Sequence, residues 1–308
     1  MRVSTKTSKF GVSKREGHDS TLFYNSRLYE DFYIDEKIPC LENSISKNVI
    51  DKVLCQDSRN MENIPDSSIH LMVTSPPYNV SKEYDQNLTM EEYGELLKDV
   101  FLETYRVLVS GGRACINIAN VGRKPYIPYH SFIINIMLDI GFLMRGEIIW
   151  NKNASAGTST AWGSWMSASN PTLRDVHEYI LVFSKDKFQL ERKNKDNTIS
   201  KEEFLEYTKS VWGFSAESAK KVGHPAPFPI ELPYRFIQLY TYKDDVILDP
   251  FCGVGTSCLA ALEADRHFIG FDINQEYVDK SNIRLKEKLD QTCLDLFLIP
   301  SVEKLSSN

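Results

Sequence analysis

A stretch rich in glycine, LDPFCGVGTS at 248–257, has the composition of a turn that binds a ligand. It follows a short apolar run typical of a buried strand, and Asp-Pro ends that run. Gly253 and Gly255 permit a tight turn and a close approach of the backbone to a ligand. Thr256 could cap a helix that begins directly after the turn.

An acidic residue follows this turn at a spacing that suits a nucleoside. A second apolar run ends at Asp272, nineteen residues after Gly253. A carboxylate at about that distance lies at the tip of the neighbouring strand, where it can accept both ribose hydroxyls. The turn lacks GxGxxG spacing and a GK[ST] ending, which disfavours a dinucleotide or a triphosphate. An isolated GxG is usually a structural turn, but the full series of elements favours a nucleoside-type ligand.

A second motif, VTSPPYNV at 73–80, could bind an amino group on a planar base. Pro76 and Pro77 fix an extended backbone and remove two amide donors. An amino group could donate to the Ser75 hydroxyl and the Pro76 carbonyl while its ring stacks on Tyr78. A proline-stiffened loop or a polyproline ligand is the alternative. The position after an apolar strand, in a chain that also carries the nucleoside turn, favours base binding.

The elements around these motifs alternate between strand and helix from residue 49 onward. We expect strands at 69–73, 114–118, 146–150, 179–183, 246–248 and 268–271. We expect helices at 90–109, 129–140, 229–240, 257–264 and 275–288, with Gly111, Gly112 and Gly141 as helix stops. This alternation predicts an α/β fold: a mostly parallel, twisted sheet with helices on both faces.

Composition and charge limit the class of protein. The chain is 42% hydrophobic and 25% charged, as in ordinary soluble globular proteins, and no apolar run reaches the roughly 20 residues of a membrane helix. The basic, polar N-terminus is not a secretory signal. Six cysteines without CxxC pairs predict reduced thiols in a cytoplasmic protein, with neither a disulfide frame nor a zinc site. A net charge of −6 argues against binding of nucleic acid by phosphate neutralisation alone, but enclosing one nucleotide needs only a local positive face.

The two motifs together resemble those of the amino-methylating DNA methyltransferases of restriction–modification systems. The stretch 73–80 matches the catalytic motif [D/N/S]PP[Y/F] in its serine form, and 248–257 matches the cofactor loop DPFxGxGT. The catalytic motif comes first, which is the permuted order of the beta class. The resemblance covers about 54–285. It implies a Rossmann-like methyltransferase fold, S-adenosyl-L-methionine as the cofactor, and methylation of a base flipped out of double-stranded DNA.

The resemblance also assigns roles to individual residues. The catalytic motif would consist of Ser75, Pro76, Pro77 and Tyr78. The cofactor-binding residues would be Asp57, Pro225, Phe228, Asp249, Phe251, Cys252, Gly253, Gly255, Thr256 and Asp272, and no metal is implied. A loop at 153–174 resembles a DNA-facing element, and the segment 184–223 lies where the beta class carries target recognition. From these two regions the candidate DNA contacts are Trp162, Trp165, Arg174, Lys185, Lys187, Arg192 and Lys193, although the charged segment could also be a solvated helical excursion.

The expected organisation has five parts: an N-terminal arm (1–45), a catalytic half (46–183), the target-recognition insertion (184–223), a half that binds S-adenosylmethionine (224–290) and a C-terminal tail (291–308). The expected partner is double-stranded DNA. A cognate restriction endonuclease could act beside the protein without a physical complex, in a prokaryotic cell or a phage. The protein could be a monomer or a homodimer.

The choice of base depends mainly on Ser75. Within the family, SPPY accompanies methylation of cytosine at N4, whereas DPPY and NPPY accompany methylation of adenine at N6. A neutral hydroxyl holds an amino group less strongly than a carboxylate, yet it could still hold adenine. We therefore expect N4-cytosine methylation, with N6-adenine as the alternative. Cys252 has no Pro-Cys context, which disfavours C5 methylation. RNA or protein amide methylation usually shows the reverse motif order, and a non-catalytic binding module would be favoured if Ser75, Pro76 or Tyr78 were missing.

Overall fold

The computed structural model describes residues 24–30, 34–79, 87–152, 163–215 and 228–298. The chain divides into two compact units, Met1–Lys37 and Ile38–Asn308. The described part of the first unit contains one 3-10 turn, η1 (Arg27–Tyr29), without a buried residue. All other elements belong to the second unit. Among the described residues, no helix has both the length and the apolarity that crossing a membrane requires.

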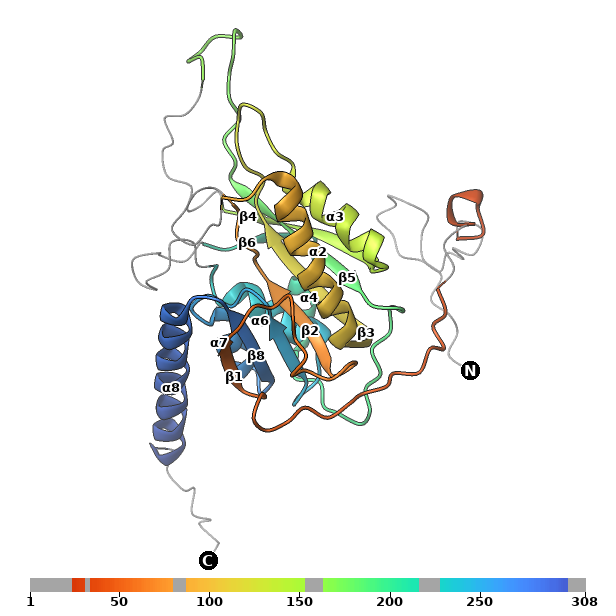
Figure 1. The fold of residues 1–308 in the computed structure, drawn as a ribbon, viewed down its shortest axis with the longest axis vertical. Coiled ribbons are helices and arrows are strands. Elements are labelled where there is room, and N and C mark those ends of the chain that lie inside the picture. The colour runs from red at the N-terminus through yellow and green to blue at the C-terminus, as the bar shows by residue number, and fades with distance from the viewer. Residues whose placement is uncertain (1–23, 31–33, 80–86, 153–162, 216–227, 299–308) are drawn as a thin grey trace, which may run out of the picture. The chain divides into compact units, whose positions relative to one another are not determined.

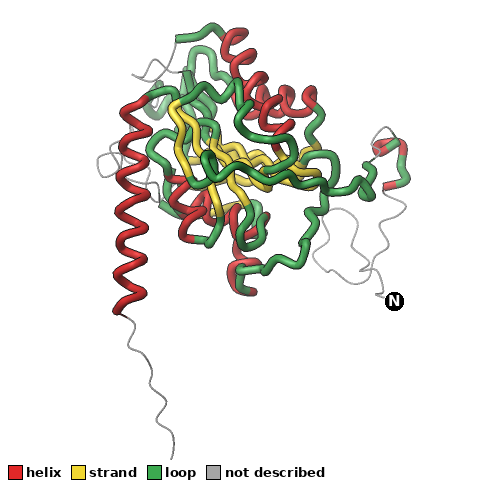
Figure 2. Tube along the Cα trace, turned by 60° about the horizontal axis from the view of Figure 1, so that its bottom comes forward, coloured by secondary structure: helices red, strands yellow, loops and turns green. Residues whose placement is uncertain are grey.

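The second unit is built on one eight-stranded sheet, which lies between helices in Figures 1 and 2. Its strands are β1 (Lys52–Cys55), β2 (Ile69–Thr74), β3 (Leu108–Ile118), β4 (Leu143–Asn151), β5 (His177–Ser184), β6 (Val211–Gly213), β7 (Val246–Asp249) and β8 (His267–Asp272). Their order across the sheet is β1-β8-β7-β2-β3-β5-β4-β6. Only β5 is antiparallel to its neighbours, β3 and β4, among the pairs the described strands form. The predicted α/β fold with a mostly parallel sheet is therefore confirmed.

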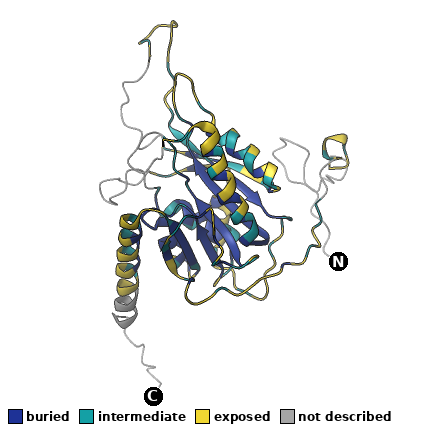
Figure 3. Ribbon diagram, in the orientation of Figure 1, coloured by how far each residue is buried: buried dark blue, intermediate teal, exposed yellow. Residues whose placement is uncertain are grey.

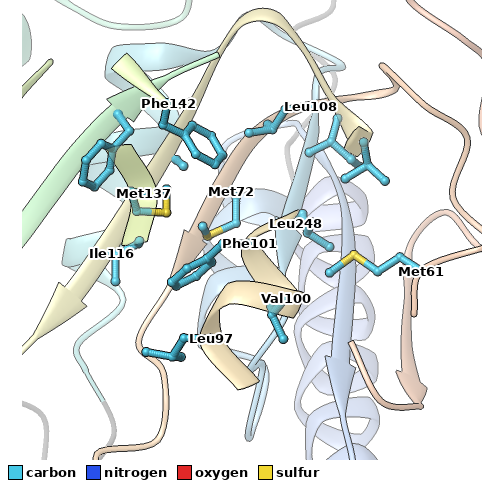
Figure 4. Packing of buried hydrophobic residues seen from close by; sticks show 14 of the residues in the cluster. Met61, Met72, Leu97, Val100, Phe101, Leu108, Ile116, Met137, Phe142 and Leu248 are labelled. Carbon is cyan, nitrogen blue, oxygen red and sulfur yellow. The ribbon is translucent and has the colours of Figure 1, made fainter. Parts of the chain in front are cut away.

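Helices cover both faces of this sheet. They are α2 (Met90–Val107), α3 (Tyr129–Ile140), α4 (Lys201–Tyr207), α6 (Glu231–Tyr240), α7 (Thr256–Glu263) and α8 (Gln275–Leu298). Successive side chains of a strand point to opposite faces, so Met72 of β2 packs with α2 and α3 while Leu71 and Val73 pack with α6 and α7. Figure 4 shows the first cluster, with Phe101 beside Met72. The central strands are buried on both sides, as the dark blue strands in Figure 3 show.

Helix α2 begins as its sequence predicts but ends two residues early. Its start is a capping box: Thr89 Oγ1 accepts from the Glu92 amide at 3.2 Å, and the Glu92 carboxylate accepts from the Thr89 amide at 2.7 Å. Leu108 already has extended dihedrals and leads directly into β3. The expected stop at Gly111 and Gly112 is therefore wrong, because both glycines lie inside β3.

Glycine is required inside β3 because another segment approaches closely. Gly111 has a positive φ of 86°, and a Cβ atom there would lie 2.2 Å from the Gln189 carbonyl oxygen. Gly141, in contrast, is the predicted stop of α3: it adopts the left-handed conformation, and its amide donates to the Leu138 carbonyl at 3.0 Å.

Only part of the segment expected as an insertion, 184–223, belongs to the domain core, because most of the residues at 189–206 are exposed. Strand β6 extends the sheet beside β4, and Trp212 on it is fully buried against Phe236 of α6. The assignment of target recognition to this segment stays a prediction. The two expected halves also share one sheet, since β7 and β8 lie between β1 and β2. They are divisions of the sequence and not separate bodies.

Candidate active site

The two predicted motifs meet at the carboxyl edge of the sheet. Strands β2 and β7 are parallel neighbours, with Met72 beside Leu248, so both motifs begin where these strands end. The contact is direct: Thr74 Oγ1 donates to Asp249 Oδ1 at 2.6 Å, across 175 positions of sequence. Open α/β sheets bind their ligands at this edge, in the crevice beyond the carboxyl ends of the strands.

The Asp249 carboxylate joins the cofactor loop to the catalytic strand. Besides the Thr74 hydroxyl, it accepts from the Phe251 amide at 3.1 Å and from the Ser257 hydroxyl. Its side chain is only 1% exposed, so it points into the protein. Burial raises the pKa of Asp249 to about 6, against the effect of these hydrogen bonds. Its part in cofactor binding would therefore be to hold the loop in shape.

Replacing Asp249 with asparagine is expected to remove a pH-dependent loss of stability. Burial raises the pKa of Asp249 from 3.8 to about 6, so the folded state favours the protonated acid. The free energy of unfolding therefore falls as the pH rises from about 3.8 to about 6 and Asp249 loses its proton. One pKa unit corresponds to about 1.4 kcal/mol, so the wild-type free energy of unfolding should fall by about 3 kcal/mol relative to the variant. Urea unfolding of both proteins between pH 3 and pH 8 measures this difference. A constant difference across that range would contradict the prediction.

The glycine turn after β7 has the backbone that its sequence predicts. Gly253 and Gly255 have positive φ angles of 52° and 80°, and a Cβ atom on Gly255 would lie 2.1 Å from Ser281 Oγ on α8. The expected cap by Thr256 is wrong: Gly255 occupies the N-cap position, and the helix has no side-chain cap. Cys252 is buried, and its hydrogen bond with Cys258, together with burial, raises the pKa of its thiol. The thiol therefore stays protonated, unlike a cysteine nucleophile.

Asp272 at the tip of β8 has the features expected of a ribose ligand. Its Oδ2 accepts from the Gly253 amide at 2.9 Å, and its Oδ1 accepts from the Asn274 amide at 2.8 Å. The side chain is only partly exposed, and burial raises its pKa. Each carboxylate oxygen keeps a lone pair for a further donor. A partly buried carboxylate beside a positive-φ glycine turn fits the ribose diol of S-adenosylmethionine.

The other expected cofactor residues differ in their positions. Phe251 is partly exposed beside Asp249, and Phe228 is partly buried just before α6. Asp57 follows β1 but forms an ion pair with Arg59 at 2.6 Å, and Arg59 lowers its pKa. Pro225 lies outside the described residues. Among the residues that the structure describes, no group of three or more His, Cys, Asp or Glu could hold a metal ion.

The SPPY motif continues from β2 into a polar network that the sequence did not reveal. Ser75 is partly exposed and Pro76 is buried. The Tyr78 hydroxyl donates to Glu178 Oε2 at 3.2 Å, and the Asn117 amide donates to the same oxygen at 2.6 Å. Lys152 forms an ion pair with the other Glu178 oxygen. These three partners lie at strand ends of this edge, which is the signal that could have identified them.

Two of the lysines expected to contact DNA are buried, and the expectation is wrong for them. Lys185 and Lys187 are 8% and 2% exposed. Lys185 Nζ donates to the Leu108 carbonyl at 2.7 Å, and Lys187 Nζ donates to the Ile38 carbonyl. Burial lowers the pKa of Lys185. Both ammonium groups are used to satisfy backbone carbonyls of the protein, so neither is available to a phosphate.

Arg192 and Lys193 lie near the opposite edge of the sheet. Their neighbour Lys195 donates to Asp245 Oδ1 at 2.7 Å, one residue before β7 begins, and also contacts His70 near the start of β2. Lys193 itself pairs with Glu42 at 3.1 Å, and His70 contacts the same carboxylate at 3.1 Å. Arg192 and Lys193 are therefore far from the carboxyl edge, where the target base would be held, and their position does not support contacts to the phosphates beside that base.

The loop between β4 and β5 rises from the same edge as the SPPY motif. Strand β4 ends there and β5 begins there, because Trp150 is the register partner of Glu178. In the described part of this loop, Trp165 is 66% exposed and Arg174 is also exposed. Trp162 lies outside the described residues. Two predicted DNA contacts, Trp165 and Arg174, therefore belong to a loop that connects strands at the same edge of the sheet as the catalytic motif.

Comparison with known proteins agrees with this geometry. The family model of the N6/N4 DNA methylases matches residues 69–283. The type II methyltransferase M.MjaI of Methanocaldococcus jannaschii is 32% identical over 284 residues, covering 77% of this chain and 92% of the relative. M.MthZI of Methanothermobacter thermautotrophicus is 31% identical and covers 77% of each chain.

Solved structures show the same fold. TTHA0409 of Thermus thermophilus, solved in complex with S-adenosyl-L-methionine, has a TM-score of 0.62 and 27% identity, covering 77% of this chain and 95% of that one. PvuII DNA methyltransferase has a TM-score of 0.61 at 22% identity, covering 77% of this chain and 89% of that one. The chain belongs to the S-adenosylmethionine-dependent DNA methyltransferases of type II restriction–modification systems that methylate amino groups at N6 or N4.

Proposed function

We propose that the chain transfers a methyl group to the exocyclic N4 of a cytosine flipped out of double-stranded DNA. The observation that carries this proposal is the position of Ser75. Ser75 is the first residue after β2. The last residue of that strand, Thr74, is hydrogen-bonded at 2.6 Å to Asp249 of the cofactor loop. The acceptor for an amino group and the loop for the methyl donor are thereby held at one edge of the sheet.

The target base must leave the duplex, because a paired amino group cannot be reached inside it. Unstacking costs a few kcal/mol, and stacking of the base on Tyr78 offsets part of this cost. The lone pair of the exocyclic nitrogen is delocalised into the ring, which makes it a weak nucleophile. Hydrogen bonds from the amino group to Ser75 Oγ and the Pro76 carbonyl would favour a more tetrahedral nitrogen and direct its lone pair.

When bound, S-adenosylmethionine supplies a methyl group activated by a sulfonium. Asp272 would hold its ribose, and the turn at Gly253 and Gly255 would allow the close approach of the backbone. Phe228 and Phe251, both partly exposed, would contact its adenine or methionine part. The residues of the chain therefore act by positioning and electrostatics, and no covalent enzyme intermediate is needed.

Cytosine is favoured over adenine because the motif has a serine and not an acidic or amide residue. The hydroxyl is a neutral acceptor, and in the family this form accompanies N4-cytosine methylation. Mass spectrometry of nucleosides, after the purified protein has acted on unmethylated duplex DNA of varied sequence, separates the two products. We expect 4-methylcytosine. The appearance of 6-methyladenine would move the proposal to the adenine alternative, and no methylated nucleoside would contradict both.

We further propose that the β4–β5 loop contacts the duplex. Replacing Arg174 with alanine should weaken DNA binding and reduce the slope of log K against log salt concentration by about 1, as expected for one lost phosphate contact. Arg192→Ala is the matched control, since Arg192 is an exposed arginine near the opposite edge. Salt-dependent binding of a fluorescent duplex measures both slopes. Equal slopes for Arg174→Ala and wild type would argue against this surface.

The biological setting follows from the proposed substrate. A DNA methyltransferase of this type acts in the cytoplasm of a prokaryotic cell or on behalf of a phage. A cognate restriction endonuclease would share its recognition site without forming a complex with it. The enzyme would act as a monomer or a homodimer, and analytical ultracentrifugation distinguishes the two.

A further inference from the structure

We propose that Glu178 is a positioning residue that sets the direction of the Ser75 hydroxyl through Tyr78. A chain of hydrogen bonds from Glu178 to Tyr78 to Ser75 directs the Ser75 proton away from the target base. Ser75 Oγ then presents lone pairs, and not its proton, to the amino group. This inference rests on the proposed function, because it explains how Ser75 accepts from that amino group.

The direction of these hydrogen bonds follows from the number of protons available. Tyr78 has one hydroxyl proton, and it goes to Glu178 Oε2 at 3.2 Å. The Tyr78 oxygen is then an acceptor: the Ala119 backbone amide donates to it, and so does the Ser75 hydroxyl at 3.5 Å. This distance is long for two hydroxyls, but catalytic hydrogen bonds are often long without substrate and shorten when it binds. With its only proton used, Ser75 Oγ is left as a pure acceptor.

The Glu178 carboxylate, at one end of these hydrogen bonds, is held in place by two further partners. Its side chain is only 12% exposed, and Lys152 forms an ion pair with its Oε1. Asn117 Nδ2 donates to Oε2 at 2.6 Å and lies 3.4 Å from the Tyr78 oxygen. The carboxylate on β5 is thus held by Asn117 of β3 and by Lys152, the residue directly after β4.

The Tyr78 phenol keeps its proton in this arrangement. Burial raises its pKa well above the ordinary value, and the nearby Glu178 charge raises it further. Without the carboxylate, the phenol proton could turn toward Ser75. The Ser75 proton would then point toward the amino group of the base, where two donors would face each other.

A double-mutant cycle tests whether Glu178 acts on Ser75 through Tyr78. Glu178→Gln should slow single-turnover methyl transfer by roughly 10- to 100-fold, the range expected for a misdirected group, and leave the affinity for S-adenosylmethionine unchanged. In a Tyr78→Phe background the same change should slow transfer by less than about twofold, because the link to Ser75 is already missing. An additive loss in both backgrounds, as a purely structural role of Glu178 would produce, overturns the proposal, and so does a wild-type rate for Glu178→Gln.

Two further variants keep the test decisive. Glu147→Gln makes the same charge change on the neighbouring strand β4 and should leave the rate unchanged. If Glu178→Gln does not fold, Glu178→Asp enters the same cycle: it keeps the charge beside Lys152 but cannot reach Tyr78, and the same non-additive pattern is expected. Wild-type protein is assayed first on duplex DNA. An inactive wild type contradicts the proposed function and this inference with it, whereas an active wild type with an additive cycle contradicts only the inference.

Discussion

Replacing Asp272 with alanine is expected to weaken binding of S-adenosylmethionine by roughly 100-fold or more, since each hydrogen bond to a charged group contributes about 1.5–3 kcal/mol and two ribose hydroxyls would lose theirs. The carboxylate also orders the loop itself, because it accepts from the Gly253 and Asn274 amides at 2.9 and 2.8 Å. Its removal would therefore loosen the turn that approaches the cofactor. Isothermal titration calorimetry with S-adenosylmethionine measures the affinity directly.

Asp279→Ala is the matched control for this experiment. Asp279 is an exposed carboxylate on the first turns of α8, and its Oδ1 accepts from the Gln275 side chain at 2.8 Å. Its loss removes the same charge close to the same edge, but we expect unchanged affinity. Unfolding temperatures of both variants separate a binding defect from a folding defect. If a folded Asp272→Ala variant binds S-adenosylmethionine as tightly as wild type, Asp272 is not the ribose ligand.

Elements with a clear hydrophobic period could be predicted from the sequence. Helix α3 has the expected bounds of 129–140, because its apolar spacing and the left-handed Gly141 are local features. Strands β1 and β6 were missed, since each has a single buried residue, whereas the equally short β7 is buried throughout. They exist because they pair with β8 and β4, contacts that only the folded chain makes.

The candidate site could be predicted where a motif acts through its own backbone. The turn at Gly253 and the SPPY stretch are continuous in sequence, and the parallel sheet brings both to one edge. Lys185 and Lys187 were misinterpreted because their charge suggested phosphates, whereas the folded chain places backbone carbonyls at each ammonium group. A charge pattern does not reveal which groups compete for a lysine inside the protein.

The Glu178 network could not be predicted for a related reason. Its carboxylate is 100 positions from Tyr78 and 61 from Asn117, on a strand whose apolar pattern indicates only core. The strand is antiparallel to β3 and begins at the catalytic edge, so its first residues face the motif while the later ones are buried. The direction of this one strand decides that a charged residue reaches the site.

Replacing Ser75 with alanine should lower the rate of methyl transfer by roughly 100- to 1000-fold, the loss typical when one group that stabilises a transition state is removed. The variant keeps the fold and the cofactor loop, because the link between Thr74 and Asp249 at 2.6 Å does not involve Ser75. Affinity for S-adenosylmethionine should therefore equal that of wild type. Single-turnover transfer of a tritiated methyl group to duplex DNA measures the rate, and calorimetry measures the affinity.

Ser46→Ala removes a hydroxyl from an exposed serine in the loop before β1 and should leave both quantities unchanged. The two measurements on Ser75→Ala separate the possible roles of the hydroxyl. A lower rate with unchanged affinity places Ser75 at the reacting amino group. A lower affinity would mean that the serine supports the cofactor loop instead, and an unchanged rate would leave the Pro76 carbonyl as the acceptor that matters. Because the hydroxyl also ends the chain from Glu178, its loss should abolish any further effect of Glu178→Gln on the rate.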